Sequence, residues 1–226
     1  MENKLACYDI DGTLSKGMLA TPLVISEYQS GFVNTATCIE LAKLVIGHKF
    51  GNISYEKALD QLLRIHAFGL RGQSEAEVKN HAEKFVQQHD GIFRKFGGTV
   101  INLLRDSYDQ IIVTAEPRYM AEVVQEHFKM DGAISTQYEI VNGKFTGEIA
   151  SSLTDLDSKL KSLENRGIHI AFGNTEGDIE MLRHAEYPFC ICPTPGLRLI
   201  AIKENWPIYT GSGPLIANDI GKLLLI

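Results

Sequence analysis

The segment Leu5-Ala6-Cys7-Tyr8-Asp9-Ile10-Asp11-Gly12-Thr13-Leu14 decides the fold of this protein. Its first four residues, 5–8, are apolar and predict a buried strand. Asp9 and Asp11 follow at the point where that strand ends, and Gly12 allows the chain to turn. We therefore expect both carboxylates to face one pocket at the carboxyl end of the strand.

Two carboxylates at this spacing suit phosphoryl transfer. One Asp can attack phosphorus when a divalent cation screens the approaching phosphate. A second carboxyl close by, made a better proton donor by like-charge repulsion, can protonate the leaving oxygen and later deprotonate water. The competing interpretation is structural: Asp11 and Gly12 only form a turn that reverses the chain.

Short apolar runs alternate with helical patterns along the rest of the chain. Further strands are predicted at residues 110–114, 168–172, 189–191 and 208–209. Pro117 suits the first turn of a helix that ends near Phe128, and Asn142 with Gly143 predicts a hairpin. The alternation predicts an α/β fold with a doubly wound, mostly parallel, Rossmann-like sheet.

The connection between the first two predicted strands is unusually long. It holds about a hundred residues, whereas such loops normally hold about 2–6. Helical patterns occupy residues 55–68 and 75–88, the second after a capping box formed by Ser74 and Glu77. A third helical pattern covers residues 92–105 and should already pack on the sheet.

These patterns predict two structural parts. Residues 16–89 are interpreted as a helical cap inserted after the first strand, and residues 1–15 with 90–226 as the Rossmann-like catalytic core. Because the insertion leaves the sheet directly after Asp11, the cap should lie above the carboxyl ends of the strands. Ligands bind at that edge in open α/β sheets.

Polar residues follow the other predicted strands as well. Thr114 ends the second strand, where its hydroxyl could hold a phosphate oxygen. Lys159 could steady the transferred phosphoryl group with its ammonium, although Lys161 competes for this role. Asn174 and Asp178 lie in an oxygen-rich loop between a strand and a helix, where Asp178 could equally be a helix cap. The order and placement of these residues together favour a catalytic site.

This combination resembles the haloacid dehalogenase superfamily of phosphatases, within the branch that includes phosphoserine phosphatase. Residues 9–14 match the specific motif DxDGT[LV], and Thr114 and Lys159 follow in the same order. The segment GNTEGDIEML at residues 173–182 and the tail at 192–198 also look like that branch. The resemblance therefore spans nearly the whole chain.

The resemblance implies a role for each matching residue. Asp9 would be the nucleophile and a Mg²⁺ ligand, and Asp11 the general acid and base, with its backbone carbonyl on the metal. Thr114 and Lys159 would bind the phosphoryl group. Asp178 would belong to the acidic loop that holds Mg²⁺. The implied activity is Mg²⁺-dependent hydrolysis of a small phosphomonoester through an aspartyl-phosphate on Asp9.

Two positions depart from the family pattern. Asn174 stands where the family usually has a metal-binding Asp; its amide oxygen can coordinate Mg²⁺ but brings no charge, so weaker Mg²⁺ binding is expected. Residues 15–22 lack the Glu that phosphoserine-specific relatives use to grip the amino acid. Arg64 and Arg71 could meet a substrate carboxylate, but solvated positions are the better interpretation. Four histidines lack metal-ligand spacing and receive no role: His48, His66, His81 and His89.

Composition excludes several classes of partner. The formal charge of −6 offers no basic stripe, which argues against nucleic acid. No apolar run approaches the roughly 20 residues needed to cross a bilayer, and no signal peptide is evident. The cysteines show no CxxC pair and indicate a reducing, cytoplasmic location. We expect a small phosphorylated metabolite as the partner of a monomer or homodimer.

Three alternatives remain open from the sequence. A phosphorylatable switch similar to response-regulator receiver domains would also use a strand-end Asp, although such domains are shorter and lack a cap. A catalytically weakened pseudo-phosphatase would bind a ligand or partner, with Asn174 as the first sign of decay. A mutase of the same superfamily shares these motifs.

Overall fold

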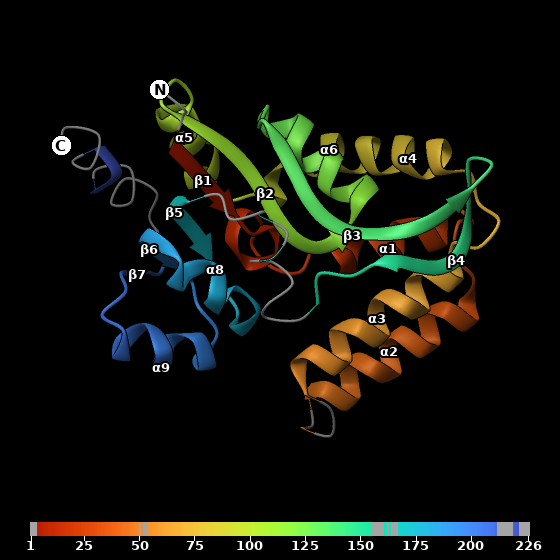
Figure 1. Ribbon diagram of the computed structural model, residues 1–226. Helices are drawn as coiled ribbons and strands as arrows, with labels where there is room; N and C mark the ends of the chain where they lie inside the picture. The colour runs from red at the N-terminus through yellow and green to blue at the C-terminus, as the bar shows by residue number, and fades with distance from the viewer. Residues whose placement is uncertain are drawn as a thin grey trace.

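The computed structural model describes residues 4–49, 51, 54–154, 161, 163, 167–211 and 219–221. Its centre is a seven-stranded sheet in the order β4-β3-β2-β1-β5-β6-β7 (Figure 1). The strands are β1 (Lys4–Tyr8), β2 (Tyr108–Pro117), β3 (Gly132–Val141), β4 (Lys144–Ser151), β5 (Ile168–Gly173), β6 (Ala185–Ile191) and β7 (Ile208–Tyr209). All neighbouring strands pair in parallel except β3 and β4, which pair antiparallel. The predicted mostly parallel sheet is confirmed.

β1 lies at the middle of the sheet, between β2 and β5. Tyr8, its last residue, is in register with Ile112 on one side and Phe172 on the other. The rings of Tyr8 and Phe172 stack at 4.7 Å between centroids. Since all three strands run the same way, their carboxyl ends open onto one edge of the sheet.

Alternate residues of β1 face opposite layers of the molecule. Ala6 and Tyr8 belong to a core shared with helices α5 and α6, whereas Leu5 and Cys7 belong to a second core shared with α8 and α9. A strand that is apolar on both faces is typical of a buried parallel sheet. The doubly wound arrangement follows from this pattern.

The helices are α1 (Ala20–Gln29), α2 (Thr35–Lys49), α3 (Tyr55–Gly69), α4 (Glu75–Gln88), α5 (Lys95–Leu104), α6 (Arg118–Phe128), α8 (Ile179–Arg183) and α9 (Pro195–Lys203). Short helical turns occupy η1 (Ile10–Leu14), η2 (Asp90–Ile92) and η3 (Glu176–Asp178). None of the helices within the described ranges is both long enough and apolar enough to cross a membrane.

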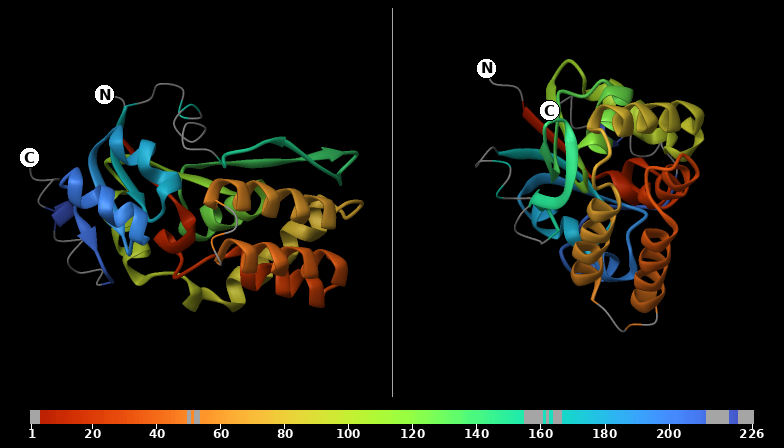
Figure 2. Two further views of the ribbon diagram at one scale, coloured as in Figure 1. Left: turned by 90° about the horizontal axis from the view of Figure 1, so that it is seen from below. Right: turned by 90° about the vertical axis from the view of Figure 1, so that its right-hand side faces the viewer.

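Helices α1 to α4 come between β1 and β2 in the chain. Figures 1 and 2 show α2 and α3 as an antiparallel pair that projects away from the sheet beside the β3–β4 hairpin. The hairpin bonds to the connection between α3 and α4 through its backbone: Gly72 N–H donates to Phe145 O at 2.8 Å, and Phe145 N–H donates to Gln73 O at 3.1 Å. The hairpin thus supports the helices of the insertion.

Helix α4 packs instead on the core helix α6. Lys79 reaches Glu122 and Glu126, each at 3.0 Å, and Arg118 of α6 pairs with Glu75 at the start of α4. The insertion therefore contains one helix tied to the core by ion pairs and a separate α2–α3 pair that leans on the hairpin.

Most predicted elements are confirmed, with specific differences. The helix at 75–88 has the expected bounds, and Ser74 Oγ accepts from Glu77 N–H at 3.4 Å. The helix predicted from residue 92 begins only at Lys95, because residues 90–92 form a separate turn. Helix α2 was not predicted from the sequence. Several of its apolar residues face solvent, which blurs the helical periodicity; these are Ile39, Val45 and Ile46.

Candidate active site

The loop after β1 is fixed by hydrogen bonds from several directions. Asp9 N–H donates to Phe172 O at 3.0 Å, which continues the β1–β5 pairing to the carboxylate itself. Gly12 has φ +72°, a conformation that favours glycine. Ser15 N–H donates to Ile10 O at 2.9 Å, and Arg94 Nε donates to the carbonyls of Gly12 and Ser15, both at 3.1 Å. The two carboxylates are therefore presented by a rigid turn.

Asn174 lies directly against this turn. A Cβ placed on Gly12 would come within 1.9 Å of Asn174 Nδ2, so only glycine leaves room for the amide. Asn174 Oδ1 is buried and has no hydrogen-bond partner among the described residues. A buried amide oxygen without a partner is costly. Its position beside the acidic turn suits an oxygen ligand for a cation.

Asp178 organises the loop that carries Asn174. Its Oδ2 accepts from Asn174 N–H at 2.9 Å and from Thr175 N–H at 3.0 Å. A Cβ on Gly173 would come within 2.5 Å of the Asp178 side chain, so the glycine permits this close packing. Asp178 thus caps the turn η3 and fixes the backbone of Asn174.

Asp11 is held by groups from two other elements. Its Oδ1 accepts from Leu19 N–H at 2.7 Å, immediately before α1 begins. Its carboxyl is also hydrogen-bonded to that of Glu116, near the end of β2. The orientation of Asp11 consequently depends on the start of the helical insertion as well as on the sheet.

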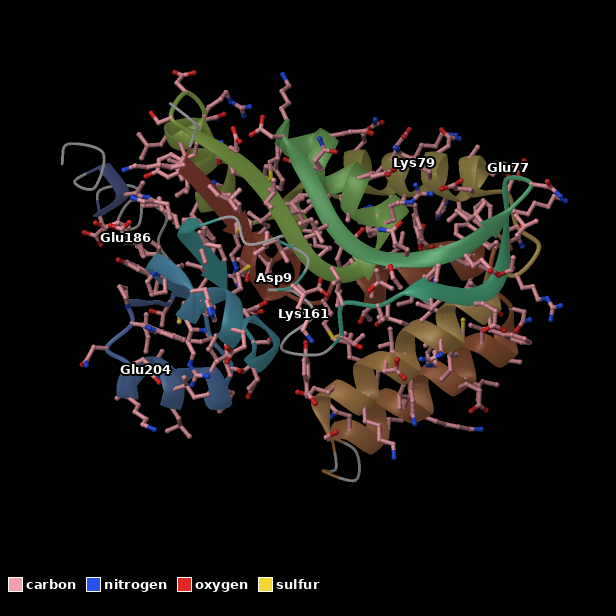
Figure 3. All side chains as sticks on the ribbon, in the orientation of Figure 1. Asp9, Glu77, Lys79, Lys161, Glu186 and Glu204 are labelled. Atoms are coloured by element: carbon pink, nitrogen blue, oxygen red, sulfur yellow. The ribbon has the colours of Figure 1, made fainter. Side chains whose placement is uncertain are left out.

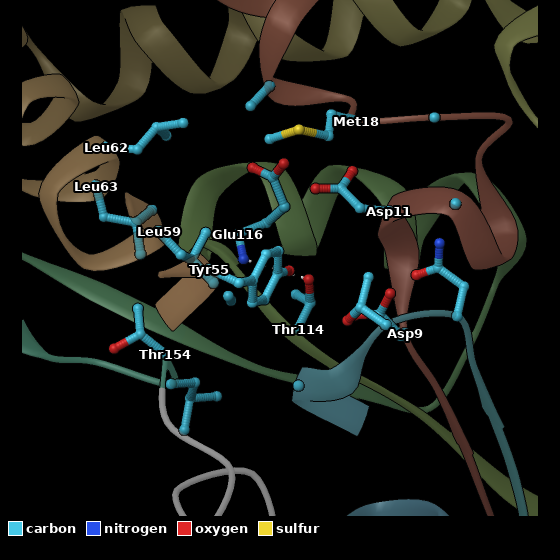
Figure 4. A pocket seen from close by; sticks show the side chains of 18 of the residues that line it. Asp9, Asp11, Met18, Tyr55, Leu59, Leu62, Leu63, Thr114, Glu116 and Thr154 are labelled. Carbon is cyan, nitrogen blue, oxygen red and sulfur yellow. Dashed lines mark hydrogen bonds between the residues drawn. The ribbon is translucent and has the colours of Figure 1, made fainter. Parts of the chain in front are cut away.

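The end of β2 contributes Thr114 and Glu116. Both are buried, and Thr114 Oγ1 accepts from Glu116 N–H at 3.2 Å. Burial, followed by the nearby charges of Asp11 and Asp9, raises the pKa of Glu116 well above its usual value. Figure 4 shows the carboxyl groups of Glu116 and Asp11 above Thr114 and that of Asp9 beside it.

These groups line a cavity of about 310 Å³. Among the predicted site residues, Asp9, Asp11, Thr114 and Asn174 lie on its wall, contributed by the ends of β1, β2 and β5. Figure 3 places Asp9 near the centre of the molecule, where the sheet meets the α2–α3 pair. Asp178 is buried and is not among the lining residues. The structure therefore brings four predicted residues together on one surface.

The two candidate lysines differ in what can be said of them. Lys159 lies outside the described residues. Lys161 is exposed and is not among the residues that line the cavity. The position of Lys161 therefore does not support a role for it as the phosphate-binding lysine.

Sequence reasoning missed much of the cavity wall, including Met18, Glu116 and two histidines to which it gave no role, His48 and His66. Glu116 stands two residues after Thr114 and could have been found from its place at a strand end. Met18 and His66 reach the cavity from the insertion, and no local sequence signal indicates this. The arginines of the insertion do not line the cavity: Arg64 is exposed and pairs with Asp60 at 2.9 Å, and Arg71 is exposed.

The described residues include no group of three or more His, Cys, Asp and Glu side chains arranged to hold a metal ion. A Mg²⁺ site of the expected kind would use fewer carboxylates, together with a backbone carbonyl, an amide oxygen and waters. The carboxylate of Asp9, the backbone of Asp11 and the buried, partnerless oxygen of Asn174 fit such a donor set.

A family model described as haloacid dehalogenase-like hydrolase matches residues 6–183, well over half of the chain. The chain belongs to the haloacid dehalogenase-like hydrolases. This match confirms the family predicted from the segments 9–14 and 173–182. No curated protein matches the chain in sequence.

Several solved structures share the fold. A protein of unknown function from Bordetella pertussis Tohama I superposes with a TM-score of 0.77 at 19% identity, covering 93% of this chain and 99% of that one. A substrate-bound phosphoserine phosphatase superposes with a TM-score of 0.67 at 17% identity, covering 96% of this chain and 98% of that one. A phospho-aspartyl intermediate analogue of phosphoserine phosphatase superposes with a TM-score of 0.64 at 18% identity, covering 94% of this chain and 95% of that one. At these identities the similarity establishes the fold.

Proposed function

We propose that this hydrolase is a Mg²⁺-dependent phosphatase that cleaves a small phosphomonoester through an aspartyl-phosphate on Asp9. One observation carries the proposal: Asp9, Asp11, Thr114 and Asn174, from three separate strand ends, line a single cavity. Membership of the hydrolase family supports the reaction class, and the fold shared with phosphoserine phosphatases supports a phosphorylated substrate.

The proposed reaction has two steps. A carboxylate oxygen of Asp9 attacks phosphorus, the bond from phosphorus to the leaving oxygen breaks, and Asp11 gives its proton to that oxygen. Asp11 then removes a proton from water, whose oxygen attacks the phosphorus of the acyl-phosphate. The products are an alcohol and inorganic phosphate, and Asp9 is regenerated.

Each neighbouring group has a part in this proposal. Thr114 donates from its hydroxyl to a phosphoryl oxygen, and Lys159 is proposed to bind a second oxygen. Asp9, the Asp11 carbonyl and Asn174 would hold Mg²⁺, while Asp178 fixes the Asn174 loop and remains a proposed member of the metal site. Mg²⁺ held by these residues would supply positive charge against the phosphate, which would permit a carboxylate to approach it.

Residues 16–89 are proposed to act as the cap, with residues 1–15 and 90–226 as the catalytic core. Met18, Tyr55 and His66 of this segment line the same cavity as Asp9. A cap that closes over bound substrate would exclude water until the leaving group departs. The cytoplasmic location is proposed from the cysteine pattern of the sequence, which contains no CxxC pair.

The decisive experiment measures phosphate release from para-nitrophenyl phosphate by the wild type and by Asp9→Asn, with Mg²⁺ and with EDTA. We expect Mg²⁺-dependent turnover that is lost in Asp9→Asn, a substitution that keeps the shape of the side chain. Equal turnover in both proteins would exclude Asp9 as the nucleophile. No turnover at any Mg²⁺ concentration would favour the pseudo-phosphatase or switch interpretation.

A further inference from the structure

The wall of the cavity that faces the strand ends is mostly apolar, although the imidazole of His48 also lies on it. Figure 4 shows Met18 opposite Asp11 and Glu116, with the leucines of α3 to one side. The apolar members contributed by the insertion are Met18, Leu59, Leu62 and Leu63, together with the ring of Tyr55. In the proposed mechanism, this wall faces the group that leaves with the ester oxygen.

His66 also lines the cavity, but its nitrogens are already engaged. Nε2 lies 2.7 Å from Glu27 Oε2, and Nδ1 lies 3.1 Å from the Tyr138 hydroxyl. Tyr119 donates its hydroxyl to the other oxygen of Glu27 at 2.7 Å. Because this buried network uses both ring nitrogens, His66 presents carbon rather than a hydrogen-bonding group to the substrate.

The charges around the cavity are unfavourable for an anion on the leaving group. Asp9, Asp11 and Glu116 lie on the wall, whereas no lysine or arginine is found among its described lining residues. Arg64 carries the positive charge nearest in sequence to the leucines of α3, and it is exposed and paired with Asp60. A substrate carboxylate would lose its water shell here without gaining a guanidinium partner.

We propose that the leaving group of the natural substrate is apolar and carries no negative charge, with Met18, Leu59, Leu62 and Leu63 as the residues that select it. This inference rests on the proposed phosphatase function and specifies its substrate class. The reaction is hydrolysis of an alkyl or aryl phosphate by water to the corresponding alcohol and inorganic phosphate. O-phosphoserine, which carries a carboxylate, is a poor substrate under this proposal.

The first test compares two esters of similar shape, 3-methylbutyl phosphate and 3-phosphooxypropanoate, with the Mg²⁺-loaded wild type. They differ in that two terminal methyl groups replace the two carboxylate oxygens. We expect kcat/KM to be higher for 3-methylbutyl phosphate by roughly tenfold or more, the scale of discrimination by an apolar pocket. Equal values, or a preference for the carboxylate, would overturn the proposal even if para-nitrophenyl phosphate is hydrolysed.

The second test adds a cation to the apolar wall. Leu62→Arg should shift the ratio of the two kcat/KM values toward the carboxylate by roughly tenfold, since Leu62 is half-buried and can accept a longer side chain. Phe68→Arg is the matched control on the same helix, because Phe68 is 62% exposed and does not line the cavity. An unchanged ratio in a folded Leu62→Arg protein would contradict the assignment of this wall.

A binding measurement separates this inference from the proposed function. Calorimetric titration of both esters into Mg²⁺-loaded Asp9→Asn requires no turnover. Tighter binding of 3-methylbutyl phosphate would support the apolar site even in a protein that proves inactive. Tighter or equal binding of 3-phosphooxypropanoate would refute it, whatever the catalytic activity.

Discussion

At the scale of single residues, Asn174 is the main departure from the family pattern. It has a neutral oxygen where the family usually has a carboxylate, and that oxygen is buried with no hydrogen-bond partner in the part of the chain that the structure describes. The loop itself is well ordered by Asp178, so the geometry is retained while one charge is lost. The expected consequence is a weaker cation site rather than a disrupted one.

Asn174→Asp should therefore tighten Mg²⁺ binding by about tenfold, because a charged oxygen replaces a neutral one at the same position. Calorimetric titration of Mg²⁺ into the wild type and the variant measures this directly. The Mg²⁺ concentration for half-maximal phosphatase activity should fall in parallel. Unchanged Mg²⁺ affinity would show that residue 174 is not a ligand.

Glu116 is the second informative residue, since its carboxyl is hydrogen-bonded to that of Asp11. Glu116→Ala removes this anchor of the proposed general acid and should lower kcat by roughly tenfold through misorientation. Glu116→Gln keeps a hydrogen-bonding group and should retain most of the activity. If both variants behave as the wild type in a para-nitrophenyl phosphate assay, Glu116 has no positioning role.

At the scale of elements, a buried polar network joins the insertion to the core. Glu27 of α1 contacts His66 of α3 and Tyr119 of α6, and His66 contacts Tyr138 of β3. Burial, followed by the charge of Glu27, raises the pKa of Tyr119 well above its usual value, which keeps that hydroxyl a donor. Four elements thus meet around one fully satisfied group.

Glu27→Ala should lower the free energy of unfolding by about 3 kcal/mol or more, because His66 and Tyr119 lose their buried partner. Lys79→Ala, which breaks partly exposed ion pairs between α4 and α6, should cost less than about 1 kcal/mol. Urea denaturation of the three proteins measures both effects. A Glu27→Ala protein as stable as Lys79→Ala would show that the network is dispensable.

At the scale of the whole molecule, the insertion is held to the core unevenly. Helix α4 is tied to α6 by ion pairs, whereas α2 and α3 lean on the β3–β4 hairpin. The ring of Tyr55, at the start of α3, lies 3.8 Å from where a Cβ on Gly177 would stand. The α2–α3 pair therefore touches the core beside the cavity and is the part best placed to move as a cap.

Hydrogen exchange followed by mass spectrometry should detect that motion. Adding Mg²⁺ and beryllium fluoride, which mimics an acyl-phosphate on Asp9, should slow exchange in α2 and α3 by severalfold, because closure protects their backbone. Exchange in α4 should change little, since it is already packed on α6. Uniform slowing across α2, α3 and α4 would argue that the insertion closes as one body, and unchanged exchange in all three would argue that it does not move.

The sequence by itself determined the family, the parallel sheet and most of the residues that meet at the candidate site. The apolar runs that lead to Asp9, Thr114 and Asn174 carry local signals, although β2 continues past Thr114 to Pro117. Parallel strands bring their carboxyl ends to one edge wherever the chain travels between them. The Asn142 and Gly143 turn was predictable for the same reason, because positive φ at both residues is a local requirement.

Only the tertiary structure decided which residues of the insertion face the cavity. The sequence does not show which face of each helix in the insertion points to the cavity, because several apolar residues of the insertion remain exposed. The packing of the insertion on the core brings Met18, Leu62 and His66 to the cavity wall. The contact between Glu116 and Asp11 likewise forms only because the ends of β1 and β2 lie side by side. Local patterns fix what each segment becomes, whereas contacts between distant segments fix the shape and charge of the pocket.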